Sequence, residues 1–362
     1  MDPWQLQITV FVIAFSAALI TVPLCRALAW KINFLDKPLS EGHKRHVKAT
    51  PVLGGLGMVT AWIGTIGGGL GLAMAGCSYI PADLIDGIGP GSPKFIQLMA
   101  ICGGVLAFLG LGMWDDRRPM SAKSKLGGQM LILLVVAHWG VKIDMLSGHP
   151  YLSTLVCWAW MLVILNAINI LDNMDGLVAG IGSIASLFFA AAAAIQGQFL
   201  VGMLSAVTCA VCCGFWFYNR NPATIFMGDA GSHFVGFMLG VQGFLVTWSD
   251  DGSPAKAALP LLLPFLILAI PLFDLAAVII IRMRNRKPIY IGDHNHISHR
   301  FVRMGFSRKN AVRLIHLLSF VIGAGALALL RSSPAVGMIL CAQAIGLLIF
   351  VTILHHTQET PS

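Results

Sequence analysis

The chain has 362 residues, of which 57% are hydrophobic and only 11% charged, and its mean hydropathy is +0.79. A soluble globular domain carries about 25% charged residues, so this composition excludes a soluble domain with one anchor and indicates a polytopic membrane protein. The net charge is +8, and the chain contains eight cysteines. Nearly all the cysteines fall inside apolar segments, which favours small packing residues over a disulfide framework.

Apolar segments recur from the first residues to the last. The N-terminal stretch MDPWQLQITVFVIAFSAALITV has an acid where a signal peptide needs basic residues, so we expect a retained first transmembrane helix. Segments of about 17–25 apolar residues can cross a bilayer as helices. They span 6–30, 51–76, 95–114, 126–141, 151–171, 177–196, 199–217, 232–248, 257–281, 314–330 and 333–354. The sequence therefore predicts an all-α, polytopic bundle of about eleven transmembrane helices.

The lysines and arginines indicate how this bundle is oriented. If the N-terminus lies outside, 20 of the 24 Lys and Arg residues face the cytoplasm and four face out. Cytoplasmic loops carry the excess of basic residues in membrane proteins. We therefore expect the N-terminus outside and the C-terminus inside.

Acidic and histidine residues gather on that same predicted face. Those in cytoplasmic loops or at cytoplasmic helix ends are Asp36, Asp115, Asp116, Asp172, Asp175, Asp229 and Asp293, with His43, His46, His294, His296 and His299. The positive-inside rule does not explain this second grouping. We therefore expect an active site at the cytoplasmic face.

Adjacent carboxylates end the third predicted helix, in the motif LGMWDDRRP. Asp115 and Asp116 repel one another at a membrane boundary unless a cation compensates them. Nearby Lys and Arg residues or a divalent metal could do so, and a solvated helix end is the alternative. In FMGDAGSHF, Asp229 lies in a glycine-flanked turn that suits either a bound anion or a simple capped loop.

The motif NAINILDNMDGL follows an apolar segment with three asparagines and two aspartates. Asn166, Asn169 and Asn173 recur at i, i+3 and i+7 and so share one helix face. Asp172 and Asp175 follow around the turn. Placing these polar side chains in the hydrocarbon of a bilayer costs free energy, whereas a helix end at the membrane surface accommodates them.

Two basic loops complete the face. GDHNHISHRF holds the HxHxxH spacing of a conceivable zinc site, but anion binding by His296, His299 and Arg300 fits its basic surroundings better. A plainly solvated loop is the alternative. The first loop, with Lys44, Arg45 and His46, could also contact lipid headgroups.

Together these motifs place oxygen ligands and cations at the ends of several helices. Oxygen donors without thiolates suit Mg²⁺, which takes one or two carboxylates plus substrate phosphates. The cations suit a polyphosphate. The pattern indicates phosphoryl transfer between a soluble nucleotide and a membrane lipid.

The motifs WDDRRP, NAINILDNMDGL, FMGDAGS and DHNHISH resemble, in order and spacing, those of the polyprenyl-phosphate N-acetylhexosamine-1-phosphate transferases of glycosyltransferase family 4. DKP, KRH and LGG near the start and PLFD in the ninth segment also fit. The bacterial branch that transfers N-acetylglucosamine-1-phosphate from UDP-GlcNAc to undecaprenyl phosphate looks most similar. The resemblance implies one transferase domain over residues 1–362, Mg²⁺ (or Mn²⁺ in its place), the bacterial inner membrane and no nucleic-acid partner, and it allows a homodimer.

The resemblance also implies roles for single residues. Asp115 is expected to act as a base near the lipid phosphate, and Asp116 is expected close to the metal. Asn169 and Asp229 match positions that coordinate Mg²⁺.

Further residues are expected to contact substrate or to act as functional carboxylates. Asp172 and Asp175 match the functional carboxylates of their motif. The substrate-binding set comprises Lys125, Asn166, His296, His299, Arg300, Lys44, Arg45 and His46.

The chain departs from the family's pattern at three points. No third aspartate follows the pair, so a three-carboxylate metal site in that segment is disfavoured. Ser298 stands where the most similar branch has a histidine, in HISH rather than HIHH, so no imidazole role transfers to it. Asn173 stands where a glycine is usual.

Two other functions are compatible with part of this pattern. A sister transferase moves phospho-MurNAc-pentapeptide onto the same lipid, but it carries a run of three histidines. A lipid or solute transporter would place ionisable groups near the midplane, often in repeated halves. Asp274, the acid inside the ninth segment, could support the site or pack between helices.

Overall fold

The computed structural model describes residues 3–36, 49–76, 89–139, 149–246, 260–286 and 296–359. Lys44, Arg45 and His46, which were predicted to bind substrate, lie outside these ranges, as do Asp293 and His294. The described residues are almost entirely helical. They confirm an all-α architecture.

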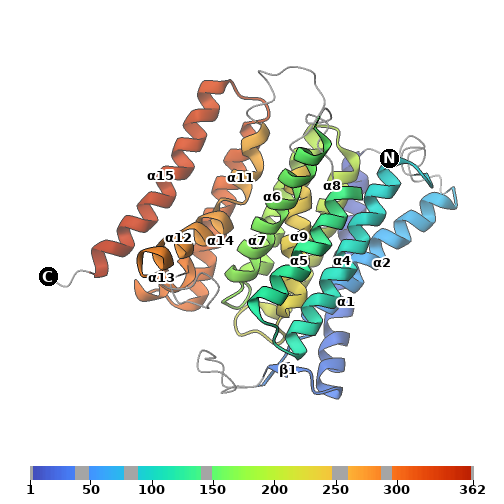
Figure 1. Ribbon diagram of the computed structural model, residues 1–362, viewed down its shortest axis with the longest axis horizontal. Coiled ribbons are helices and arrows are strands. Elements are labelled where there is room, and N and C mark those ends of the chain that lie inside the picture. The colour runs from blue at the N-terminus through green and yellow to red at the C-terminus, as the bar shows by residue number, and fades with distance from the viewer. Residues whose placement is uncertain are drawn as a thin grey trace.

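Within the described ranges, ten long helices build the bundle (Figure 1). They are α1 (Pro3–Lys31), α2 (Gly54–Met74), α4 (Pro93–Arg117), α5 (Ala122–Trp139), α6 (Pro150–Leu171), α7 (Leu177–Ile195), α8 (Phe199–Asn219), α9 (Gly228–Val246), α14 (Arg308–Ala328) and α15 (Pro334–Glu359). Shorter elements are β1 (Leu35–Asp36), β2 (Thr50–Pro51), η2 (Pro260–Leu262), α11 (Leu263–Ile267), α12 (Ala269–Arg284) and α13 (Ile297–Arg303). In Figure 1 the chain begins at the upper edge, while β1 and α13 lie at the lower ends of the helices.

Eight of the described helices are long and apolar enough to cross a membrane, namely α1, α2, α4, α6, α7, α8, α14 and α15. This finding confirms a polytopic membrane protein. The total of eleven spans and the orientation stay predictions. Two further predicted spans, α5 and α9, form helices of 18 and 19 residues with a more polar composition.

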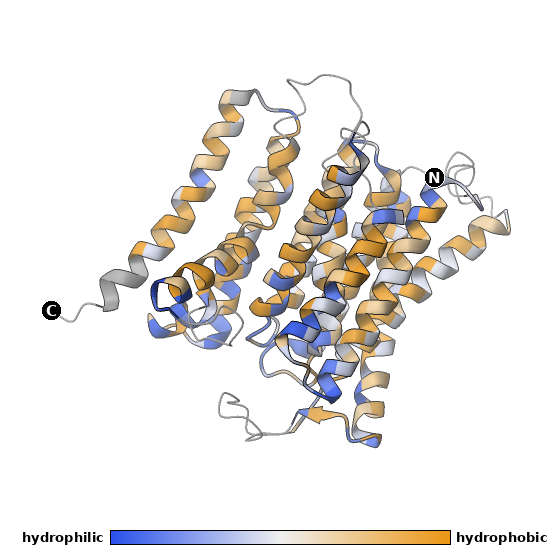
Figure 2. Cartoon of the chain, in the orientation of Figure 1, coloured by the Kyte–Doolittle hydropathy of each residue, from blue (hydrophilic) through white to orange (hydrophobic). Residues whose placement is uncertain are grey.

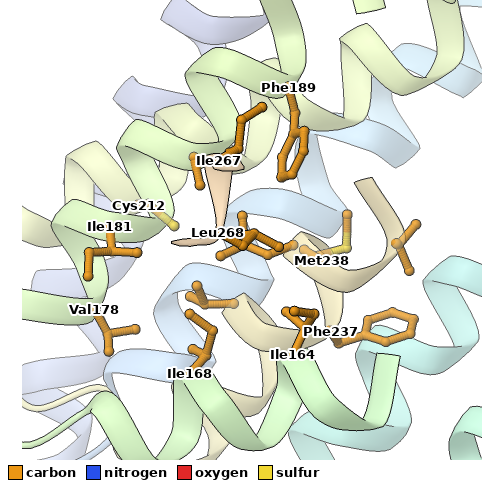
Figure 3. Close-up of a cluster of buried hydrophobic side chains, with 14 of the residues drawn as sticks. Ile164, Ile168, Val178, Ile181, Phe189, Cys212, Phe237, Met238, Ile267 and Leu268 are labelled. Carbon is orange, nitrogen blue, oxygen red and sulfur yellow. The ribbon is translucent and has the colours of Figure 1, made fainter. Parts of the chain in front are cut away.

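Helix α9 is polar because the protein, rather than lipid, surrounds it. It carries Asp229, His233 and Gln242, and all but three of its residues are buried. It packs against α2, α4, α6, α7 and α8. Figure 3 shows part of this core, with Ile168 and Met238 among the apolar side chains that meet there.

The ninth predicted segment, 257–281, is a broken helix rather than a continuous one. It is divided into η2, α11 and α12, with Leu268 between the last two. Pro271 has no N–H to donate to the carbonyl of Ile267, so regular helical hydrogen bonding fails there. The break leaves α12 only 16 residues long.

Hydrophilic residues concentrate at one end of the bundle (Figure 2). In that view blue marks α13 and the lower parts of α4 and α5, whereas orange covers most of the remaining length of the helices. Exposed apolar side chains such as Ile8, Leu131 and Ile349 suit contact with lipid. The polar end is where the predicted site residues lie.

Candidate active site

The ends of α4 and α6 meet the starts of α5 and α9 at the polar end of the bundle. These four helix termini carry Asp115, Lys125, Asn169 and Asp229. The structure joins the four side chains through ion pairs and hydrogen bonds, although they are far apart in sequence. We call these four residues the acidic cluster.

Lys125 holds the acidic cluster together. Its Nζ lies 2.9 Å from Asp115 Oδ2 and 2.9 Å from Asp229 Oδ1. Asp115 is buried, and its other oxygen accepts a 2.6 Å hydrogen bond from the backbone N–H of Met120. One ammonium therefore links the end of α4 to the start of α9.

Asn169 ties α6 to the same carboxylate. Its Nδ2 donates to Asp229 Oδ1 at 2.5 Å and to Ser232 Oγ at 2.8 Å. Sequence reasoning did not single out Ser232. The available signal was its position three residues after Asp229, which places both on one face of α9.

Asp116 accepts hydrogen bonds from the backbone at the start of α9. Asp229 N–H donates to Asp116 Oδ1 at 2.7 Å, and Ala230 N–H donates to Oδ2 at 3.2 Å. These N–H groups belong to the first turn, where no intrahelical acceptor exists. The contacts indicate that Asp116 positions α9, and its predicted metal role stays a prediction.

Two glycines permit this close approach. A Cβ at Gly112 of α4 would collide with backbone atoms of Asp229 and Ala230. Gly228 has φ of 66°, and a Cβ there would lie 2.5 Å from Asp116 Oδ2. The glycines therefore let one helix end touch the start of the next.

Asp172 ends α6 beside the acidic cluster. Its partly buried carboxyl has a pKa raised to about 7, first by desolvation and then by the charges of Asp229 and Asp175. The prediction placed it among the functional carboxylates. The structure places it within electrostatic reach of the cluster.

Asp175 makes a separate set of contacts. Its Oδ2 accepts hydrogen bonds from Asn221 Nδ2 at 3.0 Å and from Ala223 N–H at 3.1 Å. The next residue, Gly176, donates its N–H to Asn219 Oδ1 at 2.9 Å. These contacts fix the α6–α7 turn to the segment after α8, and direct participation of Asp175 stays a prediction.

Asn166 lies one helical turn deeper than Asn169, in a buried polar chain. Its Nδ2 donates to Gln129 Oε1 at 3.0 Å, and Gln129 Nε2 lies 3.0 Å from His233 Nε2. This chain connects α5, α6 and α9. Its contacts favour holding those helices together, while substrate binding by Asn166 stays a prediction.

The histidine segment is fastened at two points. His296 Nδ1 lies 2.8 Å from Asp274 Oδ2, and Ile297 N–H donates to Asp274 Oδ1 at 2.6 Å. Ser298 Oγ donates to Asn173 Oδ1 at 2.6 Å. The second bond places α13 against the α6–α7 turn, next to Asp172.

The remaining predicted residues of this segment lie on α13. The rings of His296 and His299 have centroids 6.2 Å apart, and Arg300 is buried. Sequence reasoning missed the contact between Asn173 and Ser298, although it noted both as departures from the family's pattern. A linear sequence contains no signal that joins residues 125 positions apart.

The acidic cluster and Asp116 have the donor chemistry expected for Mg²⁺. Across the described ranges, no three His, Cys, Asp or Glu side chains form a ready-made metal site. Mg²⁺ does not require one, because it commonly uses one or two carboxylates and completes its shell with water and substrate phosphates. Asp229 and Asn169 supply a carboxylate and an amide side by side.

Known proteins resemble this chain over most of its length. The family described as Glycosyl transferase family 4 matches residues 98–247. A probable undecaprenyl-phosphate N-acetylglucosaminyl 1-phosphate transferase of Bacillus subtilis is 31% identical over 91% of this chain and 87% of its own length. A decaprenyl-phosphate N-acetylglucosaminephosphotransferase of Mycolicibacterium smegmatis is 30% identical over 87% of this chain and 80% of its own.

A more distant relative comes from the sister activity. A phospho-N-acetylmuramoyl-pentapeptide-transferase of Thermoanaerobacter is 27% identical over 70% of this chain and 77% of its own length. The Bacillus and Mycolicibacterium relatives, both named for N-acetylglucosamine, match this chain at higher identity and coverage than this relative does. Motifs, helical architecture and relatives agree: the chain is a polytopic membrane member of glycosyltransferase family 4, the polyprenyl-phosphate N-acetylhexosamine-1-phosphate transferases.

Proposed function

We propose that the protein transfers N-acetylglucosamine-1-phosphate from UDP-GlcNAc to undecaprenyl phosphate with Mg²⁺, releasing UMP and undecaprenyl-diphospho-GlcNAc. The observation that carries the proposal is the acidic cluster, in which Lys125 bridges Asp115 and Asp229 while Asn169 binds Asp229. The names of the Bacillus and Mycolicibacterium relatives both support N-acetylglucosamine as the sugar, and that of the Bacillus relative supports undecaprenyl phosphate as the lipid.

The charge of the site supports a divalent cation. Asp115, Asp116 and Asp229 set three carboxylates against the single ammonium of Lys125. Such a site repels a diphosphate, so an anionic donor needs an additional cation to bind there. Asn169 and Asp229 would hold Mg²⁺, which when bound supplies charge neutralisation to the diphosphate.

The chain's own groups would position the two phosphates. Lys125, which pairs with Asp115, would exchange a carboxylate partner for a substrate phosphate, and Asp115 would take a proton from the lipid phosphate. The lipid oxygen then attacks the sugar-proximal phosphorus while the bond to the UMP phosphate breaks. The sugar C–O bond is untouched, so the anomeric configuration is retained.

We favour direct displacement over an aspartyl-phosphate intermediate. Loose phosphoryl transition states need positioning and charge neutralisation more than covalent help. The contacts of Asp115 with Lys125 and Met120 fix its carboxylate in place, which suits a base. The proposed location is the bacterial inner membrane, with the acidic cluster facing the cytoplasm, where nucleotide sugars occur.

The test is UMP release by purified protein supplied with undecaprenyl phosphate. UDP-GlcNAc, UDP-GalNAc and UDP-MurNAc-pentapeptide are offered separately, with Mg²⁺ or with EDTA. We expect turnover with UDP-GlcNAc and Mg²⁺, and none in EDTA. Turnover confined to UDP-MurNAc-pentapeptide would replace this activity with that of the sister family, and lipid transport without UMP release would contradict transferase function altogether.

Asp115→Asn tests the proposed base. We expect it to abolish UMP release while the protein still retains radiolabelled UDP-GlcNAc. Ser205→Ala is the matched control, because this buried hydroxyl of α8 has no hydrogen-bond partner among the described residues. Near-normal turnover by Asp115→Asn would show that another group accepts the proton.

A further inference from the structure

Asp274 is the buried acid of α12, and both of its oxygens are used at the start of the histidine segment. The residue is 1% exposed. Oδ2 lies 2.8 Å from His296 Nδ1, and Oδ1 accepts the N–H of Ile297 at 2.6 Å. A carboxylate has only acceptors to offer, so this geometry requires a proton on Nδ1 of His296.

The fixed proton determines what the rest of the imidazole can do. With Nδ1–H bound to Asp274, Nε2 is the ring nitrogen left to meet a substrate. When Nε2 is also protonated, the ring is a cation whose charge Asp274 balances. Such a ring donates a charge-assisted hydrogen bond to a phosphate oxygen.

The second attachment of this segment places it next to the acidic cluster. Ser298 donates to Asn173, which adjoins Asp172, and the charge of Asp229 acts on the Asp172 carboxyl. His296 is two residues before Ser298. The segment that carries the imidazole is therefore joined to the α6–α7 turn, which adjoins the acidic cluster where the donor diphosphate would bind.

We propose that Asp274 is a positioning residue for the donor. It holds Nδ1–H of His296 and so orients Nε2 toward a diphosphate oxygen of the nucleotide sugar. When Nε2–H donates to that oxygen, the Asp274 carboxylate balances the charge of the ring. The inference rests on the function proposed above, and it assigns to Asp274 a role in the affinity for the donor rather than in lipid binding or in the proton transfer.

Asp274→Asn isolates this role at constant side-chain size. The remaining oxygen can still accept the N–H of Ile297, while the amide nitrogen would donate to Nδ1 and so keep the ring neutral. The Nε2–H bond then loses its charge assistance. We expect the KM for UDP-GlcNAc to rise about tenfold, with the KM for undecaprenyl phosphate and the melting temperature close to those of the unaltered protein.

A double-mutant cycle separates positioning from general support. In a His296→Ala background, Asp274→Asn should change the donor KM little, because the residue through which Asp274 acts is already gone. If Asp274 only stabilised the helix packing, its substitution would cost the same in both backgrounds. Additive effects, or an unchanged donor KM in Asp274→Asn, would overturn the proposal.

Two further variants keep the outcome interpretable. Asp274→Ala also removes the acceptor of Ile297 N–H, so we expect a lower melting temperature in addition to the weaker donor affinity. Ser205→Ala serves again as a buried polar control in α8. Absence of UMP release by the unaltered protein would contradict the proposed function itself, whereas active protein with an unchanged Asp274→Asn variant would contradict the role of Asp274 alone.

Discussion

Lys125 is the residue whose position explains most about the acidic cluster. It lies in the first turn of α5, and its ammonium reaches carboxylates on α4 and α9 at 2.9 Å each. Neither carboxylate could approach the other so closely without that cation. The pairing shows how a membrane protein gathers like charges before any substrate arrives.

Asp172 is a carboxyl group whose ionisation destabilises the folded protein. Its pKa is raised to about 7 from an ordinary value of 3.8, so its ionisation opposes folding increasingly as pH rises between those values. We expect Asp172→Asn, which stays neutral, to raise the melting temperature in EDTA by a few degrees at pH 8 and by less at pH 5. The same variant should lose UMP release if Asp172 is a functional carboxylate.

The measurement is thermal unfolding of the unaltered protein and of Asp172→Asn, in detergent with EDTA, at pH 5 and at pH 8. The sign follows from a raised pKa: the neutral form fits the folded protein, and the penalty is complete above pH 7. A gain in melting temperature that is equal at both pH values would show that charge is not its cause.

For single residues, the sequence motifs identified the members of the site but not the groups to which they bind. Asp115, Asn169 and Asp229 were named from their motifs, and the structure joins all of them. The contacts of Asp116 with the N–H groups of α9 could not be foreseen, because a backbone donor has no signature in the sequence. Its assignment as a metal ligand rests on resemblance.

At the scale of elements, α4 and α9 make contact through Gly112. A methyl group there would collide with the backbone of Asp229 and Ala230, whereas one at Gly110 on the same helix meets nothing within 4 Å. We expect Gly112→Ala to separate the helices, to break the hydrogen bonds to Asp116 and to reduce UMP release at least tenfold.

Gly110→Ala is the matched control, since it adds the same methyl group and the same helix propensity to α4. It should keep activity and be at least as stable as the unaltered protein. Activity assays and melting temperatures for both variants make the comparison. Equal effects of the two substitutions would show that the close approach of α4 and α9 is not needed.

Helix boundaries were predictable where hydropathy defines them. The predicted segment 151–171 corresponds to α6, Pro150–Leu171. Helix α9 begins at Gly228, four residues before the predicted 232, because Asp116 accepts the N–H groups of a polar first turn. The short α13 was not predicted, since seven residues carry too little apolar periodicity to reveal a helix.

For the whole molecule, the distribution of charge predicts which way the bundle faces. The acidic cluster lies at the C-terminal end of α4, and the start of that helix carries Lys94 at the opposite end. Arg308 begins α14, which packs against α13. With the N-terminus outside, Arg308 faces the cytoplasm and Lys94 does not.

Single cysteines introduced into a cysteine-free variant test this orientation in intact cells. We expect a membrane-impermeant maleimide to label Lys94→Cys directly and Arg308→Cys only after permeabilisation, because both side chains are exposed and they lie at opposite ends of the bundle. The reverse pattern would place the acidic cluster outside the cell, away from its proposed nucleotide donor.

The hydrogen bond between Ser298 and Asn173 makes the residue at each of these positions depend on the other. Both residues depart from the pattern that the sequence resembles, and the structure shows them touching, with Ser298 fully buried. A histidine at 298 would put a larger side chain in the fully buried place of a serine, and a glycine at 173 would leave a buried hydroxyl without its acceptor. The two positions are therefore coupled through this hydrogen bond, and we expect Ser298→His and Asn173→Gly to have non-additive effects on the melting temperature.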